Sequence, residues 1–167
     1  MTLIIRSETA ADHAAIAAVT TAAFVNQPYS DGSEAAIVDR LREAGALTLS
    51  LVAINGRDEL VGHIGFSPLA TDMPGTWFGI GPLSARPDVQ RQGIGSALVR
   101  SGLDRLKGKA DGIGLVGDPN YYCRFGFAAR PGLVCDGVPD LYVQALAFID
   151  VPVWSKIAFH PAFFGAV

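Results

Sequence analysis

Residues 81–98 read GPLSARPDVQRQGIGSAL, and this stretch carries most of the information about the fold. It leads from an apolar strand through a turn with glycines at 93 and 95 into a predicted helix. The first amides of a helix have no internal partner, and the helix dipole makes that end positive. Because glycine has no side chain, a phosphate can approach these amides closely, and Arg91 adds a full charge beside them. The stretch therefore predicts a pyrophosphate site.

Two other phosphate-binding motifs fit this stretch less well. A Walker A loop needs Lys after its last glycine, and no Gly-Lys-Ser/Thr occurs at the required spacing. The dinucleotide fingerprint needs a third Gly or Ala, but residues 93–97 continue into Leu98. The strands before the turn also look antiparallel. A glycine turn that only lets the helix pack closely on the sheet is the alternative interpretation.

Outward from this stretch, the apolar spacing and the turn residues predict helices first and then a sheet. The predicted strands are 3–6, 47–54, 60–66, 76–85, 112–117 and 141–149, and the predicted helices are 9–24, 33–45, 93–106 and 119–122. Pro68, Asp72 and Pro74 are expected in a loop. The predicted fold class is α/β of the α+β type, with a mixed, mostly antiparallel central sheet flanked by helices. We expect a single domain over 1–167, with 150–167 as an aromatic C-terminal extension packed on it.

The composition narrows the class of protein. Half of the 167 residues are apolar, enough for a core, and the formal net charge of −3 with scattered Lys and Arg argues against nucleic acid. No apolar run is long enough for a signal peptide or a membrane span. Cys123 and Cys135 form no CxxC pair and give no zinc pattern. We expect a cytoplasmic protein with no metal, nucleic-acid or membrane partner.

Two motifs carry a resemblance to a known family. The segment 90–95, QRQGIG, resembles the acyl-CoA signature of the GNAT superfamily of N-acyltransferases. The preceding LSARP at 83–87 is similar to the end of that family's fourth strand. Downstream, YCRFGF at 122–127 is similar to its Tyr-x-x-x-Gly-Phe segment, and 117–127 resembles the YhbS-type branch. The order of elements agrees from residue 3 to residue 149.

The resemblance implies a GNAT fold and transfer of the acetyl group of acetyl-CoA to a primary amine through a tetrahedral intermediate. It implies that the amides of Leu83 and Ala85 hold the pantetheine arm and polarise the thioester carbonyl. The residues expected to contact acetyl-CoA are Leu83, Ser84, Ala85, Gln90, Arg91, Gln92, Gly93, Ile94, Gly95 and Ser96. Asn120 is at best a substitute for the family's usual Asn, whose position is taken by Leu115. Tyr122 is the implied general acid, with Tyr121 as its competitor.

The general base stays open, because many relatives use a Glu on the fourth strand and residues 77–83 contain no acid. The candidate bases are Glu34 at a helix start, His63 in a strand, Asp72 in a loop and Asp118 before a short helix. His63 is expected to be half-buried and hydrogen-bonded, and a water chain without a protein base is equally consistent. An acyl-CoA-binding sensor without turnover is the alternative function. The amine acceptor, the acyl-chain length and a possible homodimer stay open.

Overall fold

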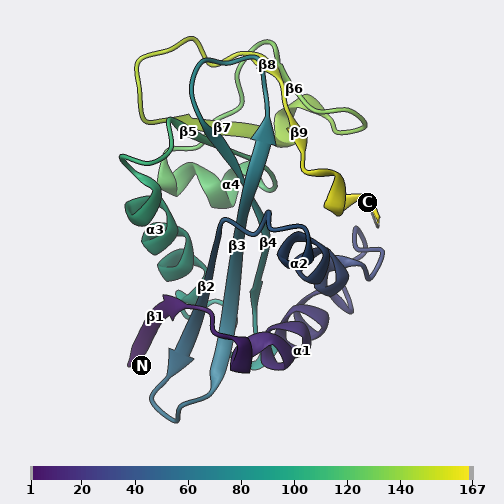
Figure 1. Ribbon diagram of the computed structural model, residues 1–167, viewed down its shortest axis with the longest axis vertical. Coiled ribbons are helices and arrows are strands. Elements are labelled where there is room, and N and C mark those ends of the chain that lie inside the picture. Colours follow the sequence, from purple (N-terminus) through teal and green to yellow (C-terminus); the bar gives the residue numbers. More distant parts are fainter. Residues whose placement is uncertain (1, 166–167) are drawn as a thin grey trace.

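The structure, a computed structural model, describes residues 2–165 (Figure 1). The main strands are β1 (Leu3–Ser7), β2 (Leu49–Asn55), β3 (Leu60–Ala70), β4 (Trp77–Ala85), β5 (Gly112–Val116) and β7 (Val143–Ala147). The short strands are β6 (Leu133–Val134), β8 (Ser155–Lys156) and β9 (Ala158–Phe159). The helices are α1 (His13–Phe24), α2 (Glu34–Glu43), α3 (Ile94–Leu106) and α4 (Pro119–Tyr122). Turns of 3-10 helix are η1 (Ala10–Asp12), η2 (Pro87–Val89), η3 (Cys123–Phe125), η4 (Asp140–Tyr142) and η5 (Pro161–Phe163).

A mixed sheet in the order β1-β2-β3-β4-β5-β7 forms the centre of the fold, and β9 joins it beside β3. β4 and β5 run parallel, whereas the other neighbouring strands in this sheet are antiparallel. β6 and β8 form a separate parallel pair. The predicted fold class, a mostly antiparallel mixed sheet flanked by helices, is confirmed.

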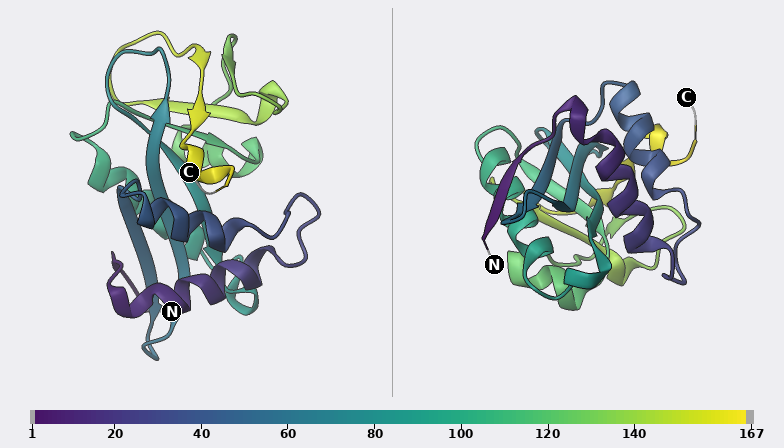
Figure 2. Two further views of the ribbon diagram at one scale, coloured as in Figure 1. Left: turned by 45° about the vertical axis from the view of Figure 1, so that its right-hand side comes forward. Right: turned by 90° about the horizontal axis from the view of Figure 1, so that it is seen from below.

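Helices cover both faces of the sheet (Figure 2). On one face, Ile16 of α1 packs in a cluster with Val52 of β2. On the other face, Ile94 of α3 packs in a cluster with Leu51, because neighbouring strand residues point to opposite sides. A Cβ on Gly62 of β3 would lie 2.7 Å from the Ile94 side chain, so the first turn of α3 rests directly on the sheet. This contact fixes the start of α3 close to the end of β4.

The third strand is longer than predicted, because Pro68 lies inside it and not in a loop. β3 continues to Ala70, and Pro68 pairs with Phe78 of β4. Pairing of β3 with β2 ends at Phe66, and β9 joins only at Leu69. Pro68, which has no backbone N–H, therefore lies in the gap between β2 and β9, where β3 has no partner strand on that side.

The late part of the chain also differs from the prediction. β7 begins at Val143 and not at residue 141, because residues 140–142 form the turn η4. β6, β8 and β9 were not predicted, since each has two residues and shows no usable alternation. These short strands depend on pairing partners that are far away in the sequence.

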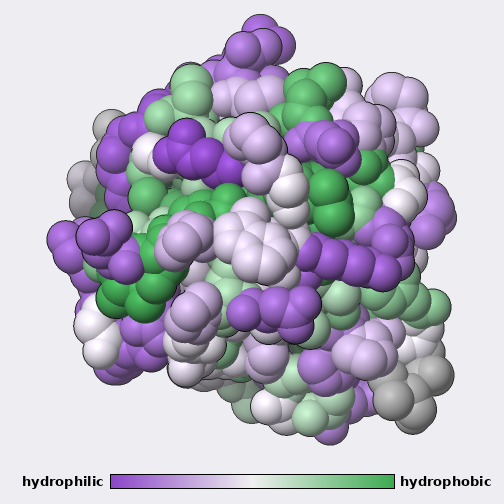
Figure 3. Space-filling model, turned by 90° about the horizontal axis from the view of Figure 1, so that it is seen from above, coloured by the Kyte–Doolittle hydropathy of each residue, from purple (hydrophilic) through white to green (hydrophobic). Residues whose placement is uncertain are grey.

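Figure 3 shows the end of the molecule that carries β6 and β8, where polar residues break up the apolar patches. None of the helices formed by residues 2–165 has the length and apolar character needed to cross a bilayer. The cytoplasmic location expected from the sequence stays a prediction, and the possible homodimer stays open.

Candidate active site

A separation between β4 and β5 defines the site. The two strands pair at only three positions, from Trp77 opposite Gly112 to Gly79 opposite Gly114. The register between β3 and β4 then shifts by one residue, since Ile64 pairs with Leu83 but Phe66 with Ile80. Such a bulge bends a strand and increases its twist. The end of β4 therefore has no strand partner on its β5 side within residues 2–165, and the backbone of residues 83–85 lines this open edge.

The first turn of α3 lies beside this open edge and has free amides. Gly93 is the N-cap residue and has a φ of 85°, and no side chain within residues 2–165 caps the helix. A Cβ on Gly93 would meet no atom within 4 Å, so the space in front of the helix is open. Arg91 also has a positive φ, of 65°, which turns the chain tightly before the helix. The geometry suits an anion held by the amides of residues 94–96.

Several predicted acetyl-CoA contacts can contribute only backbone groups. The Ser84 side chain is buried, and its Oγ lies 3.2 Å from Thr20 Oγ1 of α1. The Ile94 side chain is buried in the core. Gln90 Nε2 donates to the carbonyl of Ala85 at 3.0 Å and so ties the turn to the end of β4. Leu83 also reaches the first turn of α3, since a Cβ on Gly95 would lie 4.0 Å from its side chain, so the end of β4 and residues 90–96 lie side by side.

Tyr121 and Tyr122 of α4 occupy different surroundings. Tyr121 points at α3: its Oη is 3.5 Å from Ser96 Oγ, and a Cβ on Gly95 would lie 2.8 Å from that oxygen. The Tyr122 ring packs against the end of β5, where a Cβ on Gly117 would lie 2.5 Å from it. Burial raises the pKa of Tyr122 above its usual range, and the neighbouring hydroxyls of Tyr121 and Tyr29 raise it further. Tyr122 is therefore protonated at neutral pH.

The entrance to α4 is held by residues that the sequence pattern did not single out. Gln144 of β7 is fully buried, and its Nε2 donates to the Gly117 carbonyl at 3.0 Å. Its Oε1 has no hydrogen-bond partner among residues 2–165. The only sign of this role in the sequence was that Gln144 is a polar residue within the mostly apolar predicted strand 141–149. Asn120 is exposed, and its backbone amide donates to the Asp118 carboxylate at 2.9 Å.

Three of the candidate bases are carboxylates at separate places. Glu34, at the start of α2, is hydrogen-bonded to Ser30 and lines a cavity of about 160 Å³ between α1 and α2. Asp118 is exposed and acts as the N-cap of α4. Asp72 is exposed in the β3–β4 connection, where its amide donates to Ser155 Oγ, and so lies at the opposite end of β4 from Leu83.

The fourth candidate, His63, belongs to a buried network. It is fully buried in β3 and not half-buried, as the sequence suggested, because α1 covers this face. Its Nε2 lies 2.8 Å from Ser50 Oγ, which also hydrogen-bonds to the Glu8 carboxylate. Since an ionised carboxylate only accepts, Ser50 donates to Glu8 and accepts from the His63 Nε2–H. Nδ1 is therefore unprotonated, and it has no hydrogen-bond partner within the described residues 2–165.

The charges around this network keep His63 neutral. Burial lowers the pKa of His63 to about 4. The negative charge of Glu8 raises this pKa, and the positive charge of Arg42 lowers it further. Burial raises the pKa of Glu8, but hydrogen bonds from Arg42 and Ser50 outweigh it and hold that pKa below its usual value. Arg42 donates to both Glu8 oxygens, at 2.9 and 3.0 Å, and His13 Nε2 lies 3.0 Å from Glu8 Oε2.

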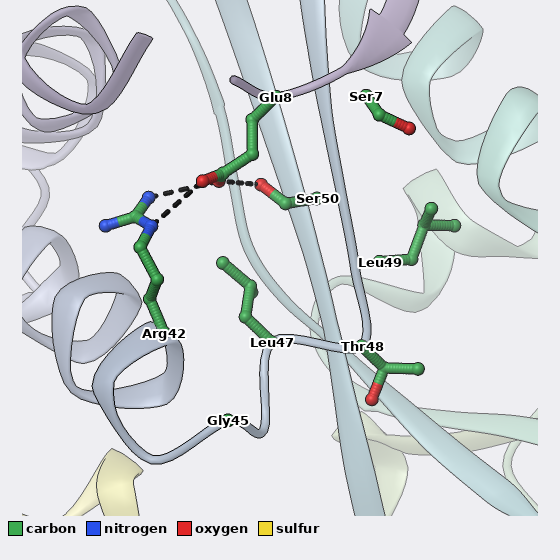
Figure 4. Close-up of a pocket in the computed structure, with 8 residues that line it drawn as sticks. All are labelled: Ser7, Glu8, Arg42, Gly45, Leu47, Thr48, Leu49 and Ser50. Atoms are coloured by element: carbon green, nitrogen blue, oxygen red, sulfur yellow. Dashed lines mark hydrogen bonds and ion pairs between the residues drawn. The ribbon is translucent and has the colours of Figure 1, made fainter. Parts of the chain in front are cut away.

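A cavity of about 270 Å³ adjoins this network, between the end of β1, α2 and the start of β2 (Figure 4). It is lined by Ser7, Glu8, Arg42, Gly45, Leu47, Thr48, Leu49 and Ser50. None of these residues belongs to the open edge of β4 or to the first turn of α3. The Glu8 carboxylate is already hydrogen-bonded to Arg42 and Ser50, so the cavity offers no free charge to a ligand.

Comparison with known proteins assigns the family. Residues 14–127 match the model of the acetyltransferase (GNAT) family. The chain is 39% identical over 120 residues to YhbS of Escherichia coli strain K12, called an uncharacterized N-acetyltransferase, with 68% of this chain and 70% of YhbS covered. The chain therefore belongs to the GNAT acetyltransferase family.

Solved structures agree with this assignment. A GNAT family acetyltransferase from Brucella melitensis, in complex with acetyl-CoA, has a TM-score of 0.83 and 43% identity, covering 97% of this chain and 98% of that one. YhbS from Escherichia coli, in complex with CoA, has a TM-score of 0.82 and 31% identity, covering 97% and 92%. Residues 2–165 contain no cluster of three or more His, Cys, Asp or Glu side chains that could hold a metal ion.

Proposed function

We propose that this protein transfers the acetyl group of acetyl-CoA to a primary amine. The observation that carries the proposal is the open edge of β4 lying beside the uncapped first turn of α3. One side offers strand amides to an extended pantetheine arm, and the other offers helix amides to a pyrophosphate. The complexes of the Brucella melitensis and Escherichia coli relatives with acetyl-CoA and CoA support the same ligand here.

In this mechanism the chain positions the reactants and stabilises charge. The amides of Leu83 and Ala85 hold the pantetheine arm, and one of them donates to the thioester carbonyl as its oxygen becomes negative. The amides of residues 91–96 and the Arg91 charge bind the pyrophosphate. The amine attacks the carbonyl carbon directly, and holding the two reactants together supplies much of the acceleration.

Tyr122 is the proposed general acid. When the tetrahedral intermediate collapses, the carbon–sulfur bond breaks and the departing sulfur takes the Tyr122 proton. The half-buried ring packs near Phe125 and Phe127, and this packing fixes the position of the hydroxyl. Tyr122 carries its proton at neutral pH, and the tyrosinate left behind regains a proton from water before the next turnover.

Water is the proposed acceptor of the amine's proton. His63 does not fit this role, because it is fully buried and burial lowers its pKa to about 4. The Ser50–Glu8 pair instead holds the neutral His63 ring in one tautomer. Glu34 and Asp118 already accept hydrogen bonds from their own loops.

Replacing His63 by glutamine is expected to change kcat/KM for the amine less than about threefold near neutral pH, because His63 is uncharged there and takes no proton from the amine. Glutamine still hydrogen-bonds to Ser50 but has no titratable nitrogen. In both proteins the rate is expected to rise toward about pH 10.5, as more of the amine is deprotonated. The measurement is the pH dependence of kcat/KM for the amine, with His13→Gln as control because His13 contacts Glu8 from the surface. A loss of about tenfold or more in His63→Gln that shrinks at high pH would instead make His63 the base.

The proposed function is tested by measuring the release of free CoA from acetyl-CoA. A thiol reagent detects the free CoA, and a panel of primary amines is offered as acceptors. Amine-dependent release distinguishes a transferase from a protein that only senses acetyl-CoA. Binding of acetyl-CoA without release in the presence of any amine would favour the sensor.

A further inference from the structure

The C-terminal strap, residues 158–163, crosses the face of the sheet that α3 does not cover (Figure 2). Its strand β9 pairs with the end of β3, and its turn η5 packs against α2. Ala162 is fully buried there, and Arg40 Nε of α2 donates to the Ala162 carbonyl at 2.8 Å. The strap is therefore anchored at two points, which fixes the side chains between them.

The strap places two aromatic rings over glycines of β4. A Cβ on Gly79 would lie 2.8 Å from the Phe159 ring, and a Cβ on Gly81 would lie 3.7 Å from the Phe163 ring. The two rings also contact each other, with centroids 5.0 Å apart. Gly79 and Gly81 have no side chains, so on this face of β4 the rings of Phe159 and Phe163 from the strap cover the backbone at these two positions.

Phe163 lies next to the proposed position of the thioester. Gly81 lies at the bulge of β4, two residues before Leu83, in the part of β4 that no longer pairs with β5. Phe163 is half-buried, so part of its ring is available to a ligand, whereas the neighbouring Phe164 is 80% exposed. An amine that approaches the thioester from the side opposite α3 meets the Phe163 ring.

A second aromatic group lies between α1 and α2. Tyr29 is 76% exposed and meets Phe24 edge-to-face, with centroids 6.4 Å apart. Glu34 of α2 is hydrogen-bonded only to the uncharged Ser30 hydroxyl, so its negative charge remains near Tyr29. Both groups offer ring surface.

We propose that Phe163 forms the acceptor-side wall of the site and selects primary amines whose chain carries an aromatic or other apolar group. The proposal rests on the proposed acetyl transfer and adds the class of acceptor to it. An apolar group packed on a ring loses water on both surfaces, and this contact is made only by acceptors that carry such a group.

The test compares phenethylamine with ethanolamine and spermidine as acceptors, in the wild type and in Phe163→Ala, Phe163→Leu and Phe164→Ala. The wild type is expected to favour phenethylamine by about tenfold or more in kcat/KM. Phe163→Ala is expected to raise the KM for phenethylamine about tenfold while leaving the KM for acetyl-CoA unchanged, and Phe163→Leu to restore part of it. Phe164→Ala is the matched control. A preference for ethanolamine or spermidine, or equal effects of the two alanine variants, would overturn the proposal.

Binding supplies a second readout that needs no turnover. Phenethylamine is expected to raise the unfolding temperature of the wild type when the protein is saturated with CoA. Under the same conditions, the rise is expected to be smaller for Phe163→Ala. No stabilisation of the wild type by phenethylamine would overturn the acceptor class even if acetyl transfer to another amine is found. Failure of acetyl-CoA itself to bind would instead contradict the proposed function.

Discussion

Replacing Gly93 by aspartate is expected to lower the affinity for acetyl-CoA about a hundredfold or more. Gly93 has a φ of 85° and open space in front of it, where the free amides of α3 begin. An aspartate would place a negative charge where the pyrophosphate should bind, and its carboxylate would itself accept from the helix amides. Because aspartate tolerates a positive φ better than most residues with a side chain, the helix should remain folded. Titration calorimetry with acetyl-CoA measures the loss.

The matched control is Gly108→Asp, at the other end of the same helix. Gly108 also has a positive φ, of 91°, and a Cβ there would also meet nothing within 4 Å. The strain of an L-residue at positive φ is therefore similar in the two variants. Acetyl-CoA affinity is expected to stay near that of the wild type in Gly108→Asp. Equal affinities of the two variants would show that the first turn of α3 does not hold the pyrophosphate.

Replacing Tyr122 by phenylalanine is expected to lower the turnover number about a hundredfold while acetyl-CoA affinity stays within about twofold. The ring remains packed against Gly117 and Phe127, so the fold should not change. Only the proton for the departing sulfur is lost. Steady-state rates over the pH range, combined with acetyl-CoA titration, separate these two effects.

Tyr121→Phe is the comparison that identifies the acid. The Tyr121 hydroxyl lies over the first turn of α3, 3.5 Å from Ser96 Oγ. Its loss is expected to change acetyl-CoA affinity more than turnover. A larger fall in turnover for Tyr121→Phe than for Tyr122→Phe would assign the acid to Tyr121.

The sequence predicted the parts of the site that depend on neighbouring residues. A glycine turn followed by a helix lies within residues 81–98, so the start of α3 could be expected there, whereas the bulge of β4 and its open edge were not predicted. The short helix 119–122 was likewise predicted from Pro119 and is present as α4. Each of these features depends on local backbone preferences, which are read from a short window.

The remaining parts depend on contacts between distant residues. The network joins Glu8, which directly follows β1, to Ser50 of β2 and His63 of β3. The anchor of the strap joins Arg40 to Ala162, more than a hundred residues away. No window of sequence contains both partners of such a contact. Pro68 was placed in a loop for the same reason, since its tolerance inside β3 depends on where β2 stops. Register and helix packing decide these positions.

The measurement that most directly tests the account is thermal unfolding with and without acetyl-CoA, with NAD and ATP as controls. A ligand present at about a hundred times its dissociation constant stabilises the fold by roughly 2.7 kcal/mol, enough for a clear shift. The unfolding temperature is expected to rise with acetyl-CoA and to stay unchanged with NAD or ATP. No shift at saturating acetyl-CoA would contradict it and would leave the glycine turn before α3 with a packing role only.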